Sequence, residues 1–151
     1  MKKITYGYLF LGALIFIIDR ITKMVALVCC TDSAHTVNQF LSFDLLFNRG
    51  VSWGLLHSTS DTVFVFVSLV IGIITAALCW YAYHNYMRGI SIIGEICIIA
   101  GSFSNLIDRI LYRGVIDFII LSYGNLSWPV FNVADAVIVL GVGILVFQYE
   151  Q

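Results

Sequence analysis

Long apolar runs separated by short polar stretches dominate the chain. Residues 63–83 form a run of 21 residues without a charged side chain. As a helix this run would be about 31 Å long, enough to cross the ~30 Å hydrocarbon core of a bilayer. Three further runs are interrupted by charged residues. We predict an all-α membrane protein, one integral membrane domain over residues 1–151, with four transmembrane helices at about 6–28, 63–83, 90–110 and 130–149.

Residues 35–57 have a different pattern. Apolar and polar positions alternate with a period close to two from residue 37 to residue 47, which is typical of a half-buried strand. Asn48-Arg49-Gly50 has the composition of a turn, and residues 51–53 are expected to pair back. We predict a small amphipathic sheet at the membrane surface. Residues 111–129, rich in Gly, Ser, Tyr and Trp, are predicted to be an extracytoplasmic loop.

Composition supports a membrane protein and excludes several other classes. The chain is 60% hydrophobic and 11% charged, whereas soluble domains carry about 25% charged residues. A net charge of −1 without a basic stripe gives no reason to expect nucleic-acid binding. The histidines, His35, His57 and His84, lack the spacing of metal ligands. We therefore predict no metal and no cofactor.

The four predicted spans place both termini on the same side of the membrane. Lys2 and Lys3 suggest that this side is cytoplasmic, with Arg88 in the second cytoplasmic loop. Arg49 and Arg113 then lie on the opposite side, against the usual distribution of positive charge. Because polar partners surround them in the sequence, we interpret them as part of a site on the extracytoplasmic side.

Charged side chains near hydrocarbon are costly, so they mark candidate sites. Asp19 and Lys23 lie four residues apart, in the order that favours an ion pair on one helical face. The neighbours Asp108 and Arg109 are most simply explained as a structural ion pair. Glu95, inside the third span, is expected to make a hydrogen bond between helices.

Asp117 and Asp135 are the pair that chemistry favours most. Asn132 is a good candidate for the N-cap of the fourth span, which would put Asp135 in the first helical turn, where the dipole favours a carboxylate. Two neighbouring carboxyls share a proton, so one can activate water and the other can protonate a carbonyl. We expect Asp117 to hold the proton. Alternatively, both are loop and cap residues satisfied by backbone amides.

Five segments in order resemble motifs of the bacterial lipoprotein signal peptidases, also called signal peptidase II. They span nearly the whole chain, and five matches in one order make the resemblance specific. One departure is Ser104, where the family usually has glycine. The segments are Asp19-Arg20-Ile21-Thr22-Lys23, Phe47-Asn48-Arg49-Gly50-Val51-Ser52-Trp53-Gly54, Asn105-Leu106-Ile107-Asp108-Arg109, Val115-Ile116-Asp117-Phe118 and Phe131-Asn132-Val133-Ala134-Asp135.

This resemblance implies a four-helix intramembrane aspartyl endopeptidase of the bacterial inner membrane with a periplasmic β-cradle. It implies cleavage of prolipoproteins just before a cysteine that carries diacylglycerol, no metal, and inhibition by the cyclic peptide globomycin. Asp117 and Asp135 would be the catalytic dyad. Supporting or substrate-contacting roles are implied for Asp19, Lys23, Asn48, Gly50, Asn105, Asp108, Arg109, Asn132 and Ala134.

Two functions of other classes remain possible from the residues alone. A small proton-coupled transporter or channel subunit also uses acidic residues within its spans, and a membrane scaffold needs no chemistry at all. A proton relay would distribute carboxylates through the depth of the membrane. Apart from Glu95, the carboxylates of the predicted spans and of the loop near residue 117 gather at one edge, which favours a site facing the surface.

Overall fold

The computed structural model describes residues 2–31, 34–50 and 60–149. The helices within these residues are α1 (Lys2–Cys29), α2 (Asp61–Met87), α3 (Ile93–Tyr112) and α4 (Val133–Tyr149). The strands are β1 (His35–Thr36), β2 (Leu41–Asn48), β3 (Val115–Tyr123) and β4 (Leu126–Ser127). The predicted combination of four helices and a small antiparallel sheet is confirmed.

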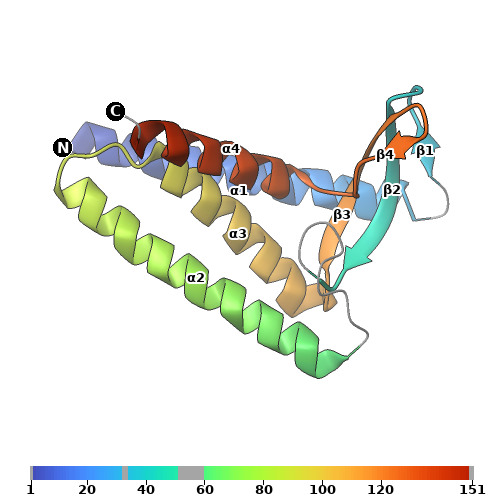
Figure 1. Ribbon diagram of the computed structural model, residues 1–151, viewed down its shortest axis with the longest axis horizontal. Helices are drawn as coiled ribbons and strands as arrows, with labels where there is room; N and C mark the ends of the chain where they lie inside the picture. The colour runs from blue at the N-terminus through green and yellow to red at the C-terminus, as the bar shows by residue number, and fades with distance from the viewer. Residues whose placement is uncertain (1, 32–33, 51–59, 150–151) are drawn as a thin grey trace.

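The helices run lengthwise, and the sheet lies across one end of them (Figure 1). Both termini and the α2–α3 connection lie at the opposite end. Helix α3 contacts each of the other three helices, whereas α2 packs mainly against α3 and diverges from the rest of the bundle toward the sheet. The carboxyl end of α3 and the amino end of α4 therefore meet beside the sheet.

Glycines allow α3 and α4 to pack backbone against backbone. A Cβ atom on Gly101 would lie 2.8 Å from the carbonyl oxygen of Ala134, and one on Gly141 would lie 2.7 Å from that of Gly94. Small residues at such crossings are typical of helix pairs in membranes. This close packing fixes the first turn of α4 against α3.

The sheet has the order β1-β2-β3-β4, and all neighbouring strands are antiparallel. Strand β2 pairs with β3 from Leu41 opposite Leu121 to Asn48 opposite Val115, with an irregularity between Phe43 and Leu46. The predicted loop over residues 111–129 is therefore wrong. The start of β3 is buried on both faces, so its sequence lacks the alternation that reveals a strand.

The predicted surface sheet matches the structure in part. Residues 41–48 form β2, but residues 37–40 form a turn in which the side chain of Asn38 accepts the backbone N–H groups of Phe40 and Leu41. Residues 51–57, at the end of the predicted sheet, lie outside the described residues.

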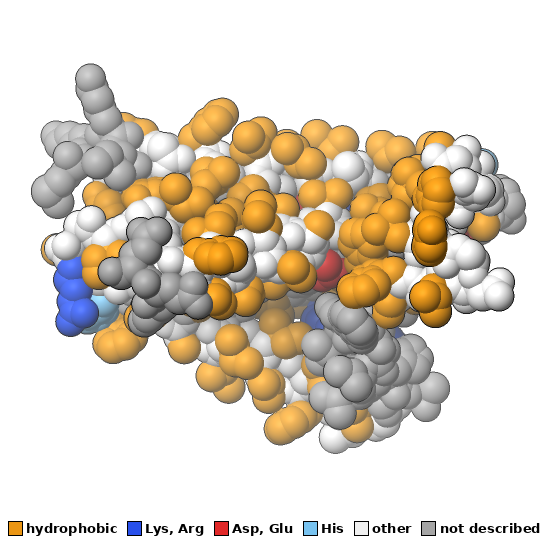
Figure 2. All heavy atoms as spheres, turned by 45° about the horizontal axis from the view of Figure 1, so that its top comes forward, with side chains coloured by type: hydrophobic (Ala, Val, Ile, Leu, Met, Phe, Trp, Pro, Cys, Tyr) orange, Lys and Arg blue, Asp and Glu red, His pale blue; other side chains and the backbone are white. Residues whose placement is uncertain are grey.

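Apolar side chains cover much of the helical surface, and acidic side chains show on the visible face only where the helices meet the sheet (Figure 2). Among the described residues, α2 is the one helix that is long and apolar enough to cross a membrane by length and composition. Helices α1 and α3 contain buried charges, and α4 has 17 residues. Of these buried charges, Asp19, Lys23, Asp108 and Arg109 build the site, whereas Glu95 does not.

Candidate active site

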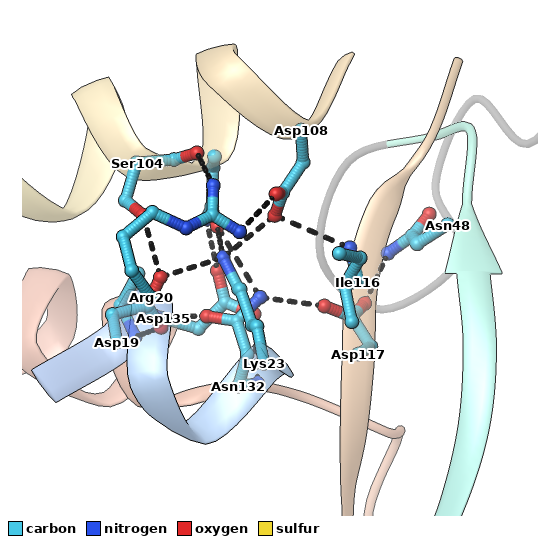
Figure 3. Close-up of polar contacts among 12 residues, drawn as sticks. Asp19, Arg20, Lys23, Asn48, Ser104, Asp108, Ile116, Asp117, Asn132 and Asp135 are labelled. Atoms are coloured by element: carbon cyan, nitrogen blue, oxygen red, sulfur yellow. Dashed lines mark hydrogen bonds and ion pairs between the residues drawn. The ribbon is translucent and has the colours of Figure 1, made fainter. Parts of the chain in front are cut away.

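Asp117 on β3 and Asp135 in the first turn of α4 line one cavity of about 230 Å³. Asparagine side chains donate hydrogen bonds to both carboxyls (Figure 3). Asn132 and Asn48 donate to the two oxygens of Asp117 over 2.7 and 2.9 Å. Asn105 donates to Oδ1 of Asp135 over 2.9 Å. The two carboxyls thus reach one cavity from strand β3 and from helix α4, which begins ten residues after the strand ends.

The start of α4 explains the position of Asp135. The Asn132 side chain accepts the backbone N–H of Asp135 over 2.9 Å, and Oδ2 of Asp135 accepts the backbone N–H of Asn132 over 3.3 Å. This is a reciprocal capping arrangement, which satisfies two backbone donors at a helix start. The predicted N-cap is confirmed, and the same residue also donates to Asp117.

The environment of Asp117 favours its protonated form. Burial raises its pKa from 3.8 to about 7, and repulsion by Asp135 adds to this effect. Hydrogen bonds donated by Asn48 and Asn132 act in the opposite direction. Asp117 can therefore hold or release a proton near neutral pH. That it carries the proton of the pair stays a prediction.

A buried cluster of charges supports the site from α1. Lys23 is fully buried, and its ammonium contacts Asp19 over 2.7 Å, Asp108 over 2.8 Å and the side-chain oxygen of Asn105 over 2.7 Å. All three donors of the lysine therefore have an acceptor. The predicted Asp19–Lys23 pair is confirmed, and Lys23 fixes the orientation of the amide that binds Asp135.

The same cluster anchors both elements that carry the dyad. Asp19 accepts the backbone N–H of Ala134 over 2.8 Å, which holds the start of α4, and the Ser104 hydroxyl over 2.6 Å. Asp108 accepts the backbone N–H of Ile116 over 3.3 Å, one residue before Asp117. Ser104, the residue that departs from the family pattern, is thus a buried donor to this cluster.

The predicted ion pair between Asp108 and Arg109 is wrong. Asp108 pairs with Arg20 over 2.5 Å and with Lys23, whereas Arg109 donates to the carbonyl of Gly50. Adjacent residues on a helix do not face each other, so Asp108 points toward α1 and Arg109 toward the end of β2.

Arg109 lines the cavity, and part of its guanidinium makes no hydrogen bond to the described residues. Its Nε and Nη1 atoms are buried without a hydrogen-bond partner among the described residues. Its guanidinium lies 5.6 Å from the ring centre of Phe64, and that of Arg49 lies 5.1 Å from the same ring, within cation–π range. Arg109 therefore brings donors without a described partner to the wall of the cavity.

A family model described as signal peptidase (SPase) II matches residues 11–150. The chain belongs to the signal peptidase II family. It is 34% identical over 150 residues to a lipoprotein signal peptidase of Aquifex aeolicus, covering 99% of this chain and 89% of that one. It is 36% identical over 129 residues to one of Clostridium novyi, covering 83% of this chain and 84% of the other.

Two solved structures, both described as bacterial membrane enzymes, have the same fold as this signal peptidase II family member. One has a TM-score of 0.75 at 22% identity, over 95% of this chain and 87% of that one. The other has a TM-score of 0.70 at 26% identity, over 95% of this chain and 92% of that one. These two comparisons show that the chain shares the arrangement of helices and sheet with those structures.

The predicted site residues of this family member fall into two groups around the cavity. A lining group faces the cavity and comprises Asn48, Gly50, Asn105, Arg109, Asp117 and Asp135. A second group lies behind it through the hydrogen bonds above and comprises Asp19, Lys23, Asp108, Asn132 and Ala134. Glu95 lies apart, near the α2–α3 connection, and accepts the predicted interhelical hydrogen bond from Asn85 over 2.9 Å.

Sequence reasoning missed Phe64, Ile71 and Ile138. The ring of Phe64 lies within cation–π range of Arg49 and Arg109. Ile71 and Ile138 line the cavity. Each lies in a predicted span, where an apolar residue carries no signal of function. Within the described part of the chain, no group of three or more His, Cys, Asp or Glu side chains is placed to hold a metal ion.

Proposed function

We propose that Asp117 and Asp135 are the catalytic dyad with which this signal peptidase II family member removes signal peptides from prolipoproteins. The family consists of aspartic endopeptidases, and the relatives named above are lipoprotein signal peptidases. The observation that carries the proposal is that two carboxyls, from β3 and α4, line one cavity. Because the charge of Asp135 disfavours ionisation of Asp117, the two carboxyls can share one proton, as acid–base catalysis requires.

Each carboxyl has a distinct task in this mechanism. Asp135 accepts hydrogen bonds from Asn105 and from the start of its own helix, a set of donors suited to a carboxylate. It takes a proton from a water molecule, which attacks the scissile carbonyl carbon. Asp117 gives its proton to the carbonyl oxygen. Collapse of the tetrahedral intermediate, with a proton delivered to the amide nitrogen, releases the two products.

We propose that the scissile bond precedes a cysteine that carries diacylglycerol. The names of the relatives support a lipid-bearing substrate. The position of the cavity also supports it, because apolar side chains exposed on α4, such as Val139 and Leu140, lie four and five residues after Asp135. A lipid could therefore remain in the bilayer during cleavage. Globomycin is expected to inhibit the same site.

We propose that all four helices cross a bacterial cytoplasmic membrane, with the sheet on the outer side and both termini inside. The apolar side chains exposed on all four helices support this placement. The termini lie at the end opposite the sheet, and Lys2 and Lys3 favour a cytoplasmic position for that end. A transporter or channel role is not favoured, since the acidic residues of the site gather at one end and, among the described residues, only Glu95 lies near the other.

Cleavage by the purified protein in detergent tests this function. A diacylglyceryl precursor is incubated with the protein beside the same precursor without lipid. We expect the lipidated form to be cut immediately before the modified cysteine and the unlipidated form to be cut far more slowly. Failure to cut the lipidated form would refute the function, and equal cleavage of both forms would refute the lipid requirement alone.

A further inference from the structure

A second and larger hollow adjoins the catalytic cavity. It has a volume of about 560 Å³ and shares Asp135 and Ile138 with the cavity. We name it the α4 groove, because it lies over the first two turns of α4 and the segment that precedes them. Its lining consists of Trp128, Pro129, Val130, Phe131, Asp135, Ala136, Ile138 and Val139.

The α4 groove and the cavity offer opposite chemistry. Among the described residues that line the groove, Asp135 is the one that is charged, and the others are apolar or aromatic. The cavity instead presents the amides of Asn48 and Asn105 and donors of Arg109 that have no partner among the described residues. A peptide backbone in the groove would bury N–H and C=O groups without partners, which is costly. A hydrocarbon chain has no such groups.

The exposed side chains around the groove continue this apolar surface outward. Val139 is 72% exposed and Leu140 is 59% exposed, one and two positions after Ile138 along α4. Trp128, 51% exposed, lies at the other end of the lining, and tryptophan is typical of the membrane–water boundary. A chain that entered at Asp135 could thus pass along α4 toward the bilayer without crossing a polar surface.

We propose that the α4 groove binds an acyl chain of the lipid on the substrate cysteine, while the peptide backbone lies in the cavity. This inference rests on the proposed function. There, the lipidated cysteine directly follows the scissile bond, so its lipid must leave the site beside the dyad. The α4 groove begins at Asp135 and has the chemistry of a hydrocarbon site.

A photo-crosslinking experiment tests the proposal without requiring cleavage. The probe is diacylglyceryl-cysteine with a diazirine in its acyl chain, and labelled peptides are identified by mass spectrometry. We expect labelling within residues 128–139. Ala136→Trp and Val139→Trp should each fill the groove and lower this labelling about tenfold. Val146→Trp, at another exposed apolar position of α4 outside the groove, should leave it unchanged.

Kinetics with long-chain and short-chain lipidated precursors give a second readout. In the wild-type protein the long-chain precursor should have the lower KM, and Val139→Trp should abolish that preference while Val146→Trp preserves it. Lipid labelling confined to α2, or labelling of the groove by a probe in the signal peptide, would overturn the proposal. Groove labelling by the lipid probe in a protein that cuts no precursor would instead refute the proposed function and leave the lipid site standing.

Discussion

Replacing Lys23 by methionine tests whether the buried charge cluster holds the site together. The change keeps a long apolar stem and removes the ammonium. It deletes the contacts with Asp19, Asp108 and Asn105, at 2.7, 2.8 and 2.7 Å. Two fully buried carboxylates then lose a partner, and the Asn105 amide that binds Asp135 loses the donor that orients it.

The expected cost follows from what remains around the two carboxylates. Breaking a buried ion pair by removing one partner costs roughly 3–5 kcal/mol. Asp19 keeps the Ser104 hydroxyl and the N–H of Ala134, and Asp108 keeps Arg20. We therefore expect the lower end, a loss of about 3 kcal/mol in the free energy of unfolding. The rate of cleavage should fall as well, because Asn105 loses the shorter of two hydrogen bonds that orient its side chain and keeps the one from Asn132 over 3.3 Å.

Unfolding in detergent, monitored by circular dichroism, measures this loss. Arg113→Met is the matched control, because the Arg113 side chain is 76% exposed and its nitrogen lies 3.6 Å from Asp61; it should unfold like the wild type. A double-mutant cycle of Lys23→Met with Asp19→Asn should show coupling, since the two groups are in contact. If Lys23→Met unfolds like the control and cleaves at the wild-type rate, the cluster does not support the site.

Two further predictions concern the pKa of Asp117 and the α3–α4 contact. Since burial raises the pKa of Asp117 to about 7, kcat/KM should fall as pH rises through about 7. The free energy of unfolding should also decrease as the pH rises from 3.8 to about 7, and Asp117→Asn should remove that decrease. A wild-type protein whose kcat/KM and stability do not change over this range would contradict the two expectations. A Cβ atom on Gly101 would lie 2.8 Å from Ala134, so Gly101→Ala should reduce stability and cleavage. Gly143→Ala, with no atom within 4 Å, should do neither, and equal effects would refute the packing argument.

The sequence predicts the helices of this fold better than its sheet. Long apolar runs identify helices whatever their neighbours, because the period and length of the run are local properties. Strand β3 escaped prediction because residues 115–118 are buried on both faces and pair with β2, nearly 70 residues earlier. Pairing between strands so far apart in the sequence produces no pattern that a short window of sequence can reveal.

The candidate site residues were predictable as a set, together with their contacts inside one helix, but their contacts between helices were not. Asp19 and Lys23 pair within one helix turn, and Asn132 caps the helix that follows it, so spacing predicts both contacts. Asp108 was assigned to its neighbour Arg109, whereas its partners come from α1. Contacts between helices depend on how α1, α3 and α4 pack, which no local pattern encodes.

Substitution of the two aspartates is the most direct test of the central claim that Asp117 and Asp135 perform the cleavage. Asp117→Asn and Asp135→Asn keep the size of each side chain but remove its acid–base chemistry. Asp44→Asn is the control, an exposed aspartate of β2 away from the cavity lining. With purified proteins and a lipidated precursor, we expect both site variants to fold and to lose cleavage, while the control cleaves at the wild-type rate. Substantial turnover by either site variant would contradict the dyad.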